Sequence, residues 1–203
     1  MAPKPRLSEE PVNRQRAVFE SAAQLICQRG YDGTSVQEIA DACGMTKAGV
    51  YHHIGSKEEL LIAIMDYGMD LFDEQVLAPA AKMSNPVEAL KFCMTRNITL
   101  VTHGANQEIT IILHEHATLH GAAAKRINAR KKKYVRFLEG AFKDAIAKKL
   151  IRTVDPTIAA YGFLGMVLWT YKWFRPGGAQ TAEQLAAGMV DLLFTGLERK
   201  EGR

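Results

Sequence analysis

Long apolar runs, cysteine pairs and catalytic patterns are what this chain of 203 residues has least of. No stretch approaches the ~20 consecutive apolar residues that a membrane-spanning helix needs, and no apolar signal region opens the chain. The three cysteines, Cys27, Cys43 and Cys93, have neither metal-binding nor redox spacing. We therefore expect a cytoplasmic protein without a membrane partner, whose cysteines are buried free thiols in a reducing compartment.

Catalytic and strand-forming patterns are also missing. No nucleophile–base pair and no glycine-rich phosphate loop is visible, so we expect neither an enzyme nor a cofactor. No run alternates convincingly with period two, whereas hydrophobic residues, 47% of the chain, recur with helical spacing. The expected fold class is all-α.

The segment from residue 34 to residue 61, TSVQEIADACGMTKAGVYHHIGSKEELL, contains the start and stop signals of two short helices joined by a tight turn. Ser35 followed by Glu38 predicts a capping box at the start of the first helix. Gly44 follows its apolar stripe, where a left-handed residue commonly ends a helix. This layout is typical of a DNA-reading helix-turn-helix.

The second short helix is expected over residues 47–53, with Thr46 as its cap. Ser56 with Glu59 predicts a further capping box at the start of a longer helix. Upstream, an apolar stripe between residues 13 and 29 predicts a first helix that packs on the other two. Together these elements make a small three-helix core.

A purely structural pair of helices can have similar start and stop signals, so the polar face of the second short helix is what favours DNA binding. Long or hydrogen-bonding side chains crowd on it, and such side chains suit contacts to phosphates and base edges. These residues are Thr46, Lys47, Tyr51, His52 and His53.

The motif GYDGTSVxxIAxxCGMTKAGVYHHIxSKEEL resembles the N-terminal signature of the TetR family of transcriptional regulators, and the likeness is detailed over residues 13–64. Ile54 stands where an aromatic residue is common and Cys43 where alanine is usual; both are apolar residues on a packing face. The resemblance implies a helix-turn-helix DNA-binding domain at residues 1–60. It implies a larger helical ligand-binding and dimerisation domain at residues 61–203, which agrees with about nine helices in all.

The same resemblance implies individual roles. Lys47 and Tyr51 would contact the DNA backbone or bases, His52 and His53 would lie along the groove, and Lys57 would hold a phosphate. The full predicted DNA-binding set is Ser35, Thr46, Lys47, Ala48, Tyr51, His52, His53 and Lys57.

The positive charge is not concentrated in the predicted DNA-binding segment. Residues 1–60 carry seven Lys and Arg against eight Asp and Glu, whereas residues 125–152 carry eleven against two. The basic segment is open to three interpretations: a solvated helix face, a second DNA-facing surface, or a site for a polyanionic ligand. Arg130 lies one turn before Tyr134, which favours an anion grip at a pocket mouth, with an outer collar of Lys131, Lys132, Lys133 and Arg136.

Beyond residue 61 the sequence predicts helices throughout. The fourth helix should run to about Leu77 and stop before Pro79, because proline disrupts a helix interior. Later helices are expected over about 85–101, 107–119, 122–149, 155–174 and 181–197, with caps at Asn85, Asp155 and Thr181.

The last two predicted helices carry more apolar surface than they can bury alone, which predicts a homodimer that presents two reading helices to a palindromic operator. The stretch YGFLGMVLWTYKWFRPGG is similar to that of TetR-type repressors of fatty-acid and sterol breakdown, which respond to acyl-CoA thioesters. A repressor released by a small apolar effector of that kind is our hypothesis. The candidate ligand-binding residues are Phe92, Ile98, Ile112, Arg130, Tyr134, Phe137, Met166, Trp169 and Trp173.

The alternative rests on HEHATLH, residues 114–120. His116 and His120 are four residues apart on one predicted helix face, which is metal-ligand spacing. The segment lacks the H-E-x-x-H order of a metalloprotease. It leaves open a metal-responsive sensor or a metal-dependent enzyme, against the simpler interpretation of surface or pocket-lining histidines.

Overall fold

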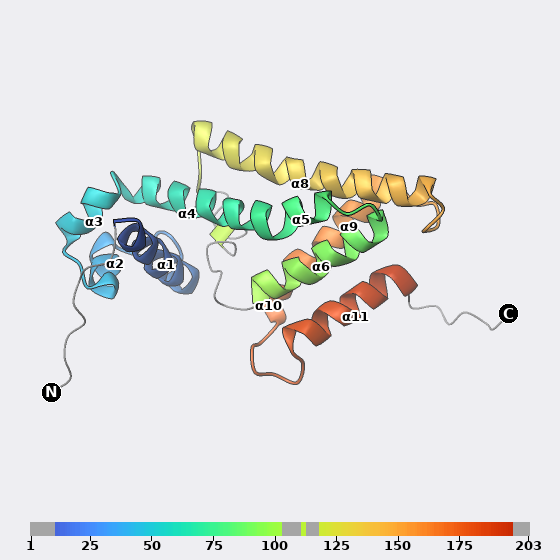
Figure 1. The fold of residues 1–203 in the computed structure, drawn as a ribbon. Coiled ribbons are helices and arrows are strands. Elements are labelled where there is room, and N and C mark those ends of the chain that lie inside the picture. The colour runs from blue at the N-terminus through green and yellow to red at the C-terminus, as the bar shows by residue number, and fades with distance from the viewer. Residues whose placement is uncertain (1–10, 103–110, 113–117, 197–203) are drawn as a thin grey trace.

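The computed structural model describes residues 11–102, 111–112 and 118–196, and every regular element in these ranges is helical (Figure 1). The expected all-α class is confirmed. The N-terminal unit consists of α1 (Pro11–Arg29), α2 (Val36–Cys43) and α3 (Lys47–His53). Within the described ranges, no helix has both the length and the apolar character that crossing a membrane requires.

A long helical rod links this unit to the rest of the chain. It consists of α4 (Lys57–Phe72), the π-helical turn η1 (Asp73–Leu77) and α5 (Ala78–Ala81). The prediction that the helix stops before Pro79 is wrong. In η1 the Ala78 N–H donates to the Asp73 carbonyl, five residues back, which shifts the hydrogen-bond register. Pro79 then falls in the first turn of α5, where its missing N–H is not needed.

The larger unit is completed by α6 (Pro86–Thr102), α8 (Gly121–Ala147), α9 (Pro156–Leu168), α10 (Thr170–Trp173) and α11 (Ala182–Thr195). The predicted caps are confirmed: Asn85 Oδ1 and Asp155 Oδ1 each accept a backbone N–H at 2.9 Å, and Thr181 forms a capping box. The helix predicted after Asp155 is interrupted at Trp169. The helix predicted over 107–119 lies mostly outside the described residues.

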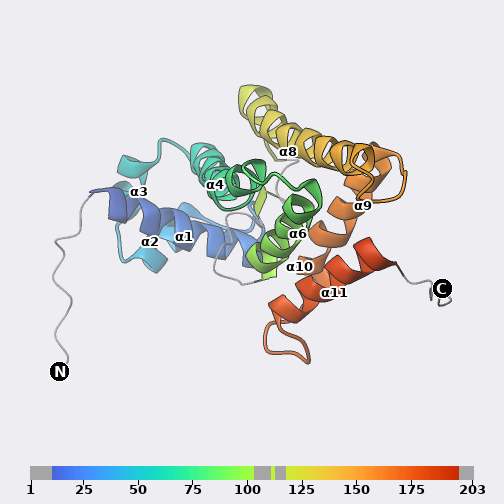
Figure 2. The same cartoon turned by 45° about the vertical axis from the view of Figure 1, so that its right-hand side comes forward.

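The long helix α8 lies along the rod, and α9 packs beneath it (Figure 1). On the opposite side α11 packs against α6, so α6 is enclosed between α11, α8 and α9 (Figure 2). This arrangement holds the N-terminal unit at one end of the rod and leaves α9 and α11 at the other.

Two hydrophobic cores divide the interior. The first joins α1, α2 and α3 to the first half of α4, where Leu60, Ile64 and Met65 are fully buried. Residues 111, 112, 119 and 127 belong to this same core. The second core begins at Phe72 and includes α6, α8, α9 and α11. The domain boundary expected at residue 60 falls within the first turn of α4, a helix that contributes to both cores.

Candidate DNA-reading surface and effector cavity

The first short helix, α2, is fixed at both ends as the sequence predicts. The Ser35 hydroxyl accepts the Glu38 N–H at 3.2 Å, and the Glu38 carboxylate accepts the Ser35 N–H at 2.8 Å. The hydrogen bonds that the Ser35 N–H and the Ser35 hydroxyl donate to this carboxylate, together with the Arg29 guanidinium, hold the pKa of Glu38 below its usual value. Gly44 ends the helix in the left-handed region with φ 66° and ψ 29°.

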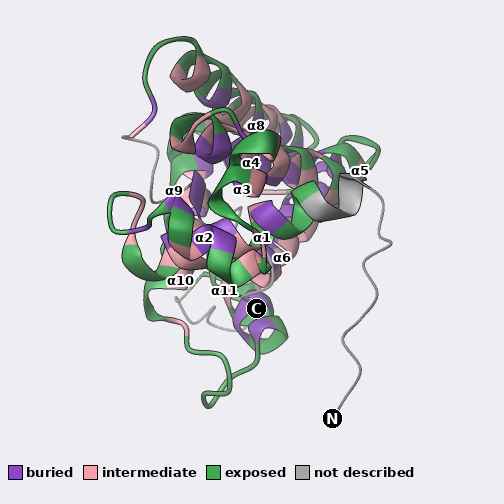
Figure 3. Cartoon of the chain, turned by 90° about the vertical axis from the view of Figure 1, so that its left-hand side faces the viewer, coloured by how far each residue is buried: buried purple, intermediate pink, exposed green. Residues whose placement is uncertain are grey.

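The second short helix, α3, packs one side against the first core and exposes the other side. The Thr46 hydroxyl accepts the Gly49 N–H at 3.0 Å, and Val50 is completely buried in the first core. The side chains of Lys47, Ala48, Tyr51 and His52 are exposed, and His53 is half-buried. Figure 3 looks onto this end of the molecule.

Lys57, at the start of α4, has a structural partner. Its Nζ donates to the Tyr31 carbonyl at 2.6 Å and lies 4.2 Å from the centre of the Tyr31 ring. The side chain therefore ties α4 to the turn that follows α1. An ammonium group has three donors, so this contact leaves donors for the phosphate that the resemblance assigns to Lys57.

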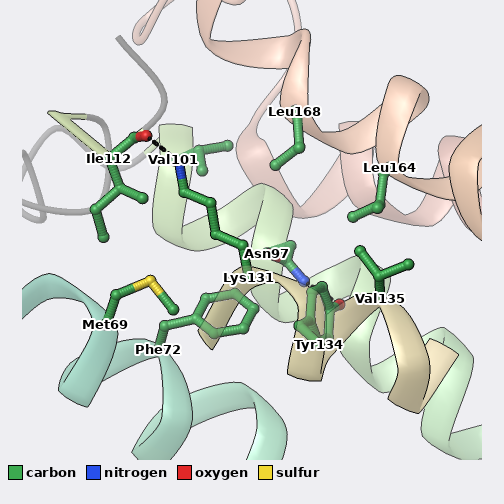
Figure 4. A pocket seen from close by; sticks show the side chains of 10 residues that line it. All are labelled: Met69, Phe72, Asn97, Val101, Ile112, Lys131, Tyr134, Val135, Leu164 and Leu168. Atoms are coloured by element: carbon green, nitrogen blue, oxygen red, sulfur yellow. Dashed lines mark hydrogen bonds between the residues drawn. The ribbon is translucent and has the colours of Figure 1, made fainter. Parts of the chain in front are cut away.

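A cavity of about 260 Å³ lies between α4, α6, α8 and α9 (Figure 4). Both hydrophobic cores line it: Met69 and Ile112 come from the first core, and Phe72 and Tyr134 from the second. The cavity thus sits at the seam between the unit that carries α3 and the larger unit. Its lining consists of Met69, Phe72, Asn97, Val101, Ile112, Lys131, Tyr134, Val135, Leu164 and Leu168.

Two of the polar side chains in the lining are bonded to each other. Asn97 Nδ2 donates to Tyr134 Oη at 2.7 Å and to the Cys93 carbonyl at 2.8 Å. The Tyr134 and Phe72 rings pack edge to face, with their centres 4.7 Å apart. Burial raises the pKa of Tyr134 well above its usual value, and the neighbouring Cys93 thiol adds to this effect. The phenol is therefore neutral and held in place.

Lys131 supplies the cationic group of the cavity. Its side chain reaches from α8 into the cavity, and Nζ donates to the Ile112 carbonyl at 2.9 Å (Figure 4). Burial lowers the pKa of this ammonium. The structure describes no carboxylate that pairs with it. The predicted outer collar thus has one member inside the cavity.

Arg130 points elsewhere. Its Nη2 lies 2.7 Å from Asp70 Oδ1 and 2.9 Å from Asp73 Oδ2, while Nη1 donates to the Asp66 carbonyl at 3.3 Å. One turn earlier, Arg126 pairs with the Asp66 carboxylate. The predicted role of Arg130 at the pocket mouth is therefore replaced by a clamp that joins α8 to α4 and η1. Acidic residues of the rod face this part of α8, which the sequence pattern of α8 alone does not reveal.

The other candidate ligand residues are spread over three environments. Ile112 and Tyr134 line the cavity, whereas Ile98 is buried in the second core, against which Phe92 and Met166 pack. Phe137 faces shallow cavities beside α5, on another side of α8. Trp169 and Trp173 are 64% and 47% exposed and do not line the cavity. The sequence pattern predicts Lys131 in the outer collar and not among the ligand residues; its position three residues before Tyr134, on the same helix face, could have indicated its place in the cavity.

The exposed tryptophans belong to an apolar surface at the far end of the molecule. It includes Ile158 and Tyr161 of α9, Trp169 between α9 and α10, Trp173 of α10 and Leu192 of α11. Ile158 is 69% exposed, which is unusual for a large aliphatic side chain. Exposed apolar patches of this kind mark association surfaces.

The histidine cluster contributes one described side chain. His120 is exposed and precedes α8 as its N-terminal cap residue, whereas His114 and His116 lie outside the described residues. Among the residues that the structure describes, no group of three or more His, Cys, Asp or Glu is placed to hold a metal ion. Of the thiols, Cys93 is buried and Cys27 and Cys43 are half-buried; none of the three forms a disulfide bond within the described residues.

Two family models match the chain. The model described as "Bacterial regulatory proteins, tetR family" matches residues 18–64, and "Tetracyclin repressor-like, C-terminal domain" matches residues 83–197. The chain belongs to the TetR family. It is a helix-turn-helix transcriptional regulator, and the resemblance of its N-terminal motif is confirmed.

Solved structures extend the likeness of this TetR-family regulator over nearly its whole length. The crystal structure of AibR in complex with isovaleryl coenzyme A and operator DNA is 64% identical, with a TM-score of 0.86, and the match covers 89% of this chain and 98% of that one. Apo AibR matches with 59% identity, a TM-score of 0.80 and the same coverage. The HTH-type transcriptional repressor KstR2 of Mycobacterium tuberculosis (strain ATCC 25618 / H37Rv) is 24% identical over 97% of this chain and 98% of its own.

Proposed function

We propose that this TetR-family regulator is a homodimeric repressor that a short-chain acyl-CoA thioester releases from a palindromic operator. The observation that carries the proposal is the apolar cavity at the seam of the two cores, with the Lys131 ammonium inside it. The 64% identical AibR, which was crystallised with isovaleryl coenzyme A and operator DNA, supports both ligands.

The DNA-reading element is α3. Its exposed Lys47, Tyr51 and His52 project from a helix whose opposite side is anchored by Val50. Side chains of these types bind phosphate oxygens and base edges in the major groove. Because residues 1–60 carry no net excess of basic residues, placement of individual side chains, and not bulk attraction, provides the recognition.

The exposed apolar face of α9, α10 and α11 is the dimer interface. A second copy covers Ile158, Tyr161 and Trp169 and so removes them from water. A symmetric interface built from helices of each copy makes a bundle across a two-fold axis. The two copies then present two α3 helices to the two halves of the operator.

The volume of the cavity sets the size of the acyl group. An apolar cavity of about 150 Å³ holds a benzene molecule, so about 260 Å³ holds a short or branched acyl chain. A fused four-ring steroid or a long straight chain exceeds it. The phosphorylated part of coenzyme A remains outside, where exposed cations of α8 such as Lys132 and Arg136 face solvent.

Release follows from where the cavity lies. Met69 and Ile112 line it and also belong to the core of the DNA-reading unit. An acyl group between these residues and Tyr134 favours one arrangement of the two cores over another. The effector therefore lowers operator affinity to the extent that it prefers the arrangement with the wrong spacing of the two α3 helices.

The proposal is tested by adding a series of CoA compounds to the protein–operator complex and measuring fluorescence anisotropy of a labelled operator. The series comprises free CoA, acetyl-CoA, isovaleryl-CoA, octanoyl-CoA and palmitoyl-CoA. We expect isovaleryl-CoA to release the operator at the lowest concentration, palmitoyl-CoA to be much weaker, and free CoA to be inactive. Operator affinity that is unchanged by every member of the series contradicts the proposed effector class.

A further inference from the structure

We propose that Lys131 donates a hydrogen bond to the thioester carbonyl oxygen of the effector, and that this contact distinguishes an acyl-CoA from other CoA conjugates of equal size. The inference rests on the proposed function and adds to it the residue that sets ligand specificity. It starts from the position of one ammonium group in a cavity that is otherwise lined mostly by hydrocarbon.

Among the polar side chains that line the cavity, Lys131 has donors to spare. Both N–H groups of the Asn97 amide are used, one by Tyr134 Oη and one by the Cys93 carbonyl. The Tyr134 hydroxyl accepts from Asn97 and lies beside the Cys93 thiol. Lys131 Nζ is described with one acceptor, the Ile112 carbonyl at 2.9 Å, although an ammonium group has three donors.

The direction of the side chain agrees with this role. In Figure 4 the Lys131 side chain crosses the cavity, with its methylene groups above the Phe72 ring and its nitrogen toward Ile112. Met69 of α4 and Leu164 of α9 line the same cavity as this side chain. The stem contacts the acyl chain, and the ammonium meets its polar end.

The energetics turn this contact into selectivity. A bound ligand displaces water from the cavity, so every ammonium donor without an acceptor costs free energy. A thioester has a carbonyl group bonded to the sulfur, and its oxygen can accept a hydrogen bond, whereas a thioether of the same length has a methylene group at that position. A hydrogen bond to a charged group corresponds to about tenfold or more in affinity, so the thioether binds correspondingly more weakly.

The contact also lies on the route from cavity to DNA-reading unit. Ile112, the present partner of Lys131, belongs to the first hydrophobic core together with Ile64 and Met69 of α4. A carbonyl oxygen in the cavity shares the Lys131 donors with Ile112. The effector is thus recognised at the point where α8 holds a residue of the other core.

The experiment is a titration calorimetry comparison of isovaleryl-CoA with S-(3-methylbutyl)-CoA, its thioether counterpart, on the full-length protein. For the wild type we expect the thioester to bind about tenfold or more tightly than the thioether. Lys131→Met keeps the apolar stem and removes the donors, so we expect it to bind the two compounds with similar affinity. Lys131→Gln retains an amide donor and should keep part of the preference.

The matched control is Lys143→Met, which removes an exposed lysine of α8 that does not line the cavity and should keep the full preference. Operator binding without effector verifies that each variant is folded. A preference that persists in Lys131→Met, or a wild type that binds both compounds equally well, overturns the role of Lys131. A wild type that binds neither compound instead overturns the proposed effector class.

Discussion

Arg130 of α8 lies 2.9 Å from the Asp73 carboxylate in η1, and the same guanidinium reaches Asp70 of α4 at 2.7 Å. The segment with the densest positive charge, residues 125–152, is therefore partly neutralised by acidic residues of the rod that carries the DNA-reading unit. The basic helix acts first as a clamp between the two halves of the molecule, and Lys131, Lys132 and Arg136 remain for the proposed ligand.

Breaking this clamp should cost stability. Arg130→Met leaves Asp70 and Asp73 close together without their shared partner, and we expect the free energy of unfolding to fall by about 1–3 kcal/mol. Urea denaturation followed by circular dichroism measures it. Lys132→Met, which removes an exposed lysine two residues further along α8, should change the value by less than about 0.5 kcal/mol. Equal stability of the two variants would show that the clamp contributes nothing.

Tyr51→Ala should abolish operator binding without unfolding the protein. The side chain is 42% exposed on α3, so its removal costs little packing, whereas it deletes the proposed contact to DNA. We expect operator affinity to fall at least tenfold, or about 1.4 kcal/mol, in an anisotropy assay. Dimer mass and thermal midpoint should stay near those of the wild type. Retained affinity would remove Tyr51 from the reading surface.

A charge placed on the exposed apolar face should separate the dimer. Trp169→Glu puts a carboxylate on a side chain that is 64% exposed in the single chain, and its burial against a second copy is unfavourable. Light scattering should then report a monomer, with operator affinity lost as well. Met83→Glu, at the exposed turn between α5 and α6, is the control and should remain dimeric. A dimeric Trp169→Glu protein would place the interface elsewhere.

The three thiols should react in two classes. Burial raises the pKa of Cys93 to about 12, so at pH 8 only about one in 10⁴ of these thiols is ionised, against about one in ten at the ordinary value of 9.0. Cys27 and Cys43 are half-buried and should react first with a disulfide reagent. Cys93 should react only on unfolding in this pH range, and ionisation should become appreciable only as the pH approaches 12. Three equally fast thiols would contradict the buried environment of Cys93.

Local features of the sequence anticipated the DNA-reading unit well. The caps at Ser35, Thr46 and Ser56 and the left-handed Gly44 depend on contacts within four residues along the chain, and each is present. Such contacts are encoded by spacing alone. The exposed face of α3 follows from the burial of Val50 on its other side.

Features that depend on distant segments were harder to predict. Arg130 meets acids some 60 positions earlier in the chain, and the spacing of α8 alone does not indicate them. Pro79 escapes its usual effect because of a π-helical turn that precedes it. Trp169 and Trp173 are residue types that often line pockets, but both are exposed. The side of α9 that packs inward carries Ala160, Phe163 and Val167 instead.

The most direct test of the account is operator release by isovaleryl-CoA from the wild type and from Leu164→Trp, measured by anisotropy of a labelled operator. Leu164 lines the cavity, so a tryptophan side chain at this position occupies the space proposed for the acyl group. We predict that the wild type releases its operator and that Leu164→Trp binds the operator normally but needs at least tenfold more effector. A wild type that stays on its operator, or a variant released at the same concentration, would contradict control of DNA binding by an acyl-CoA in this cavity.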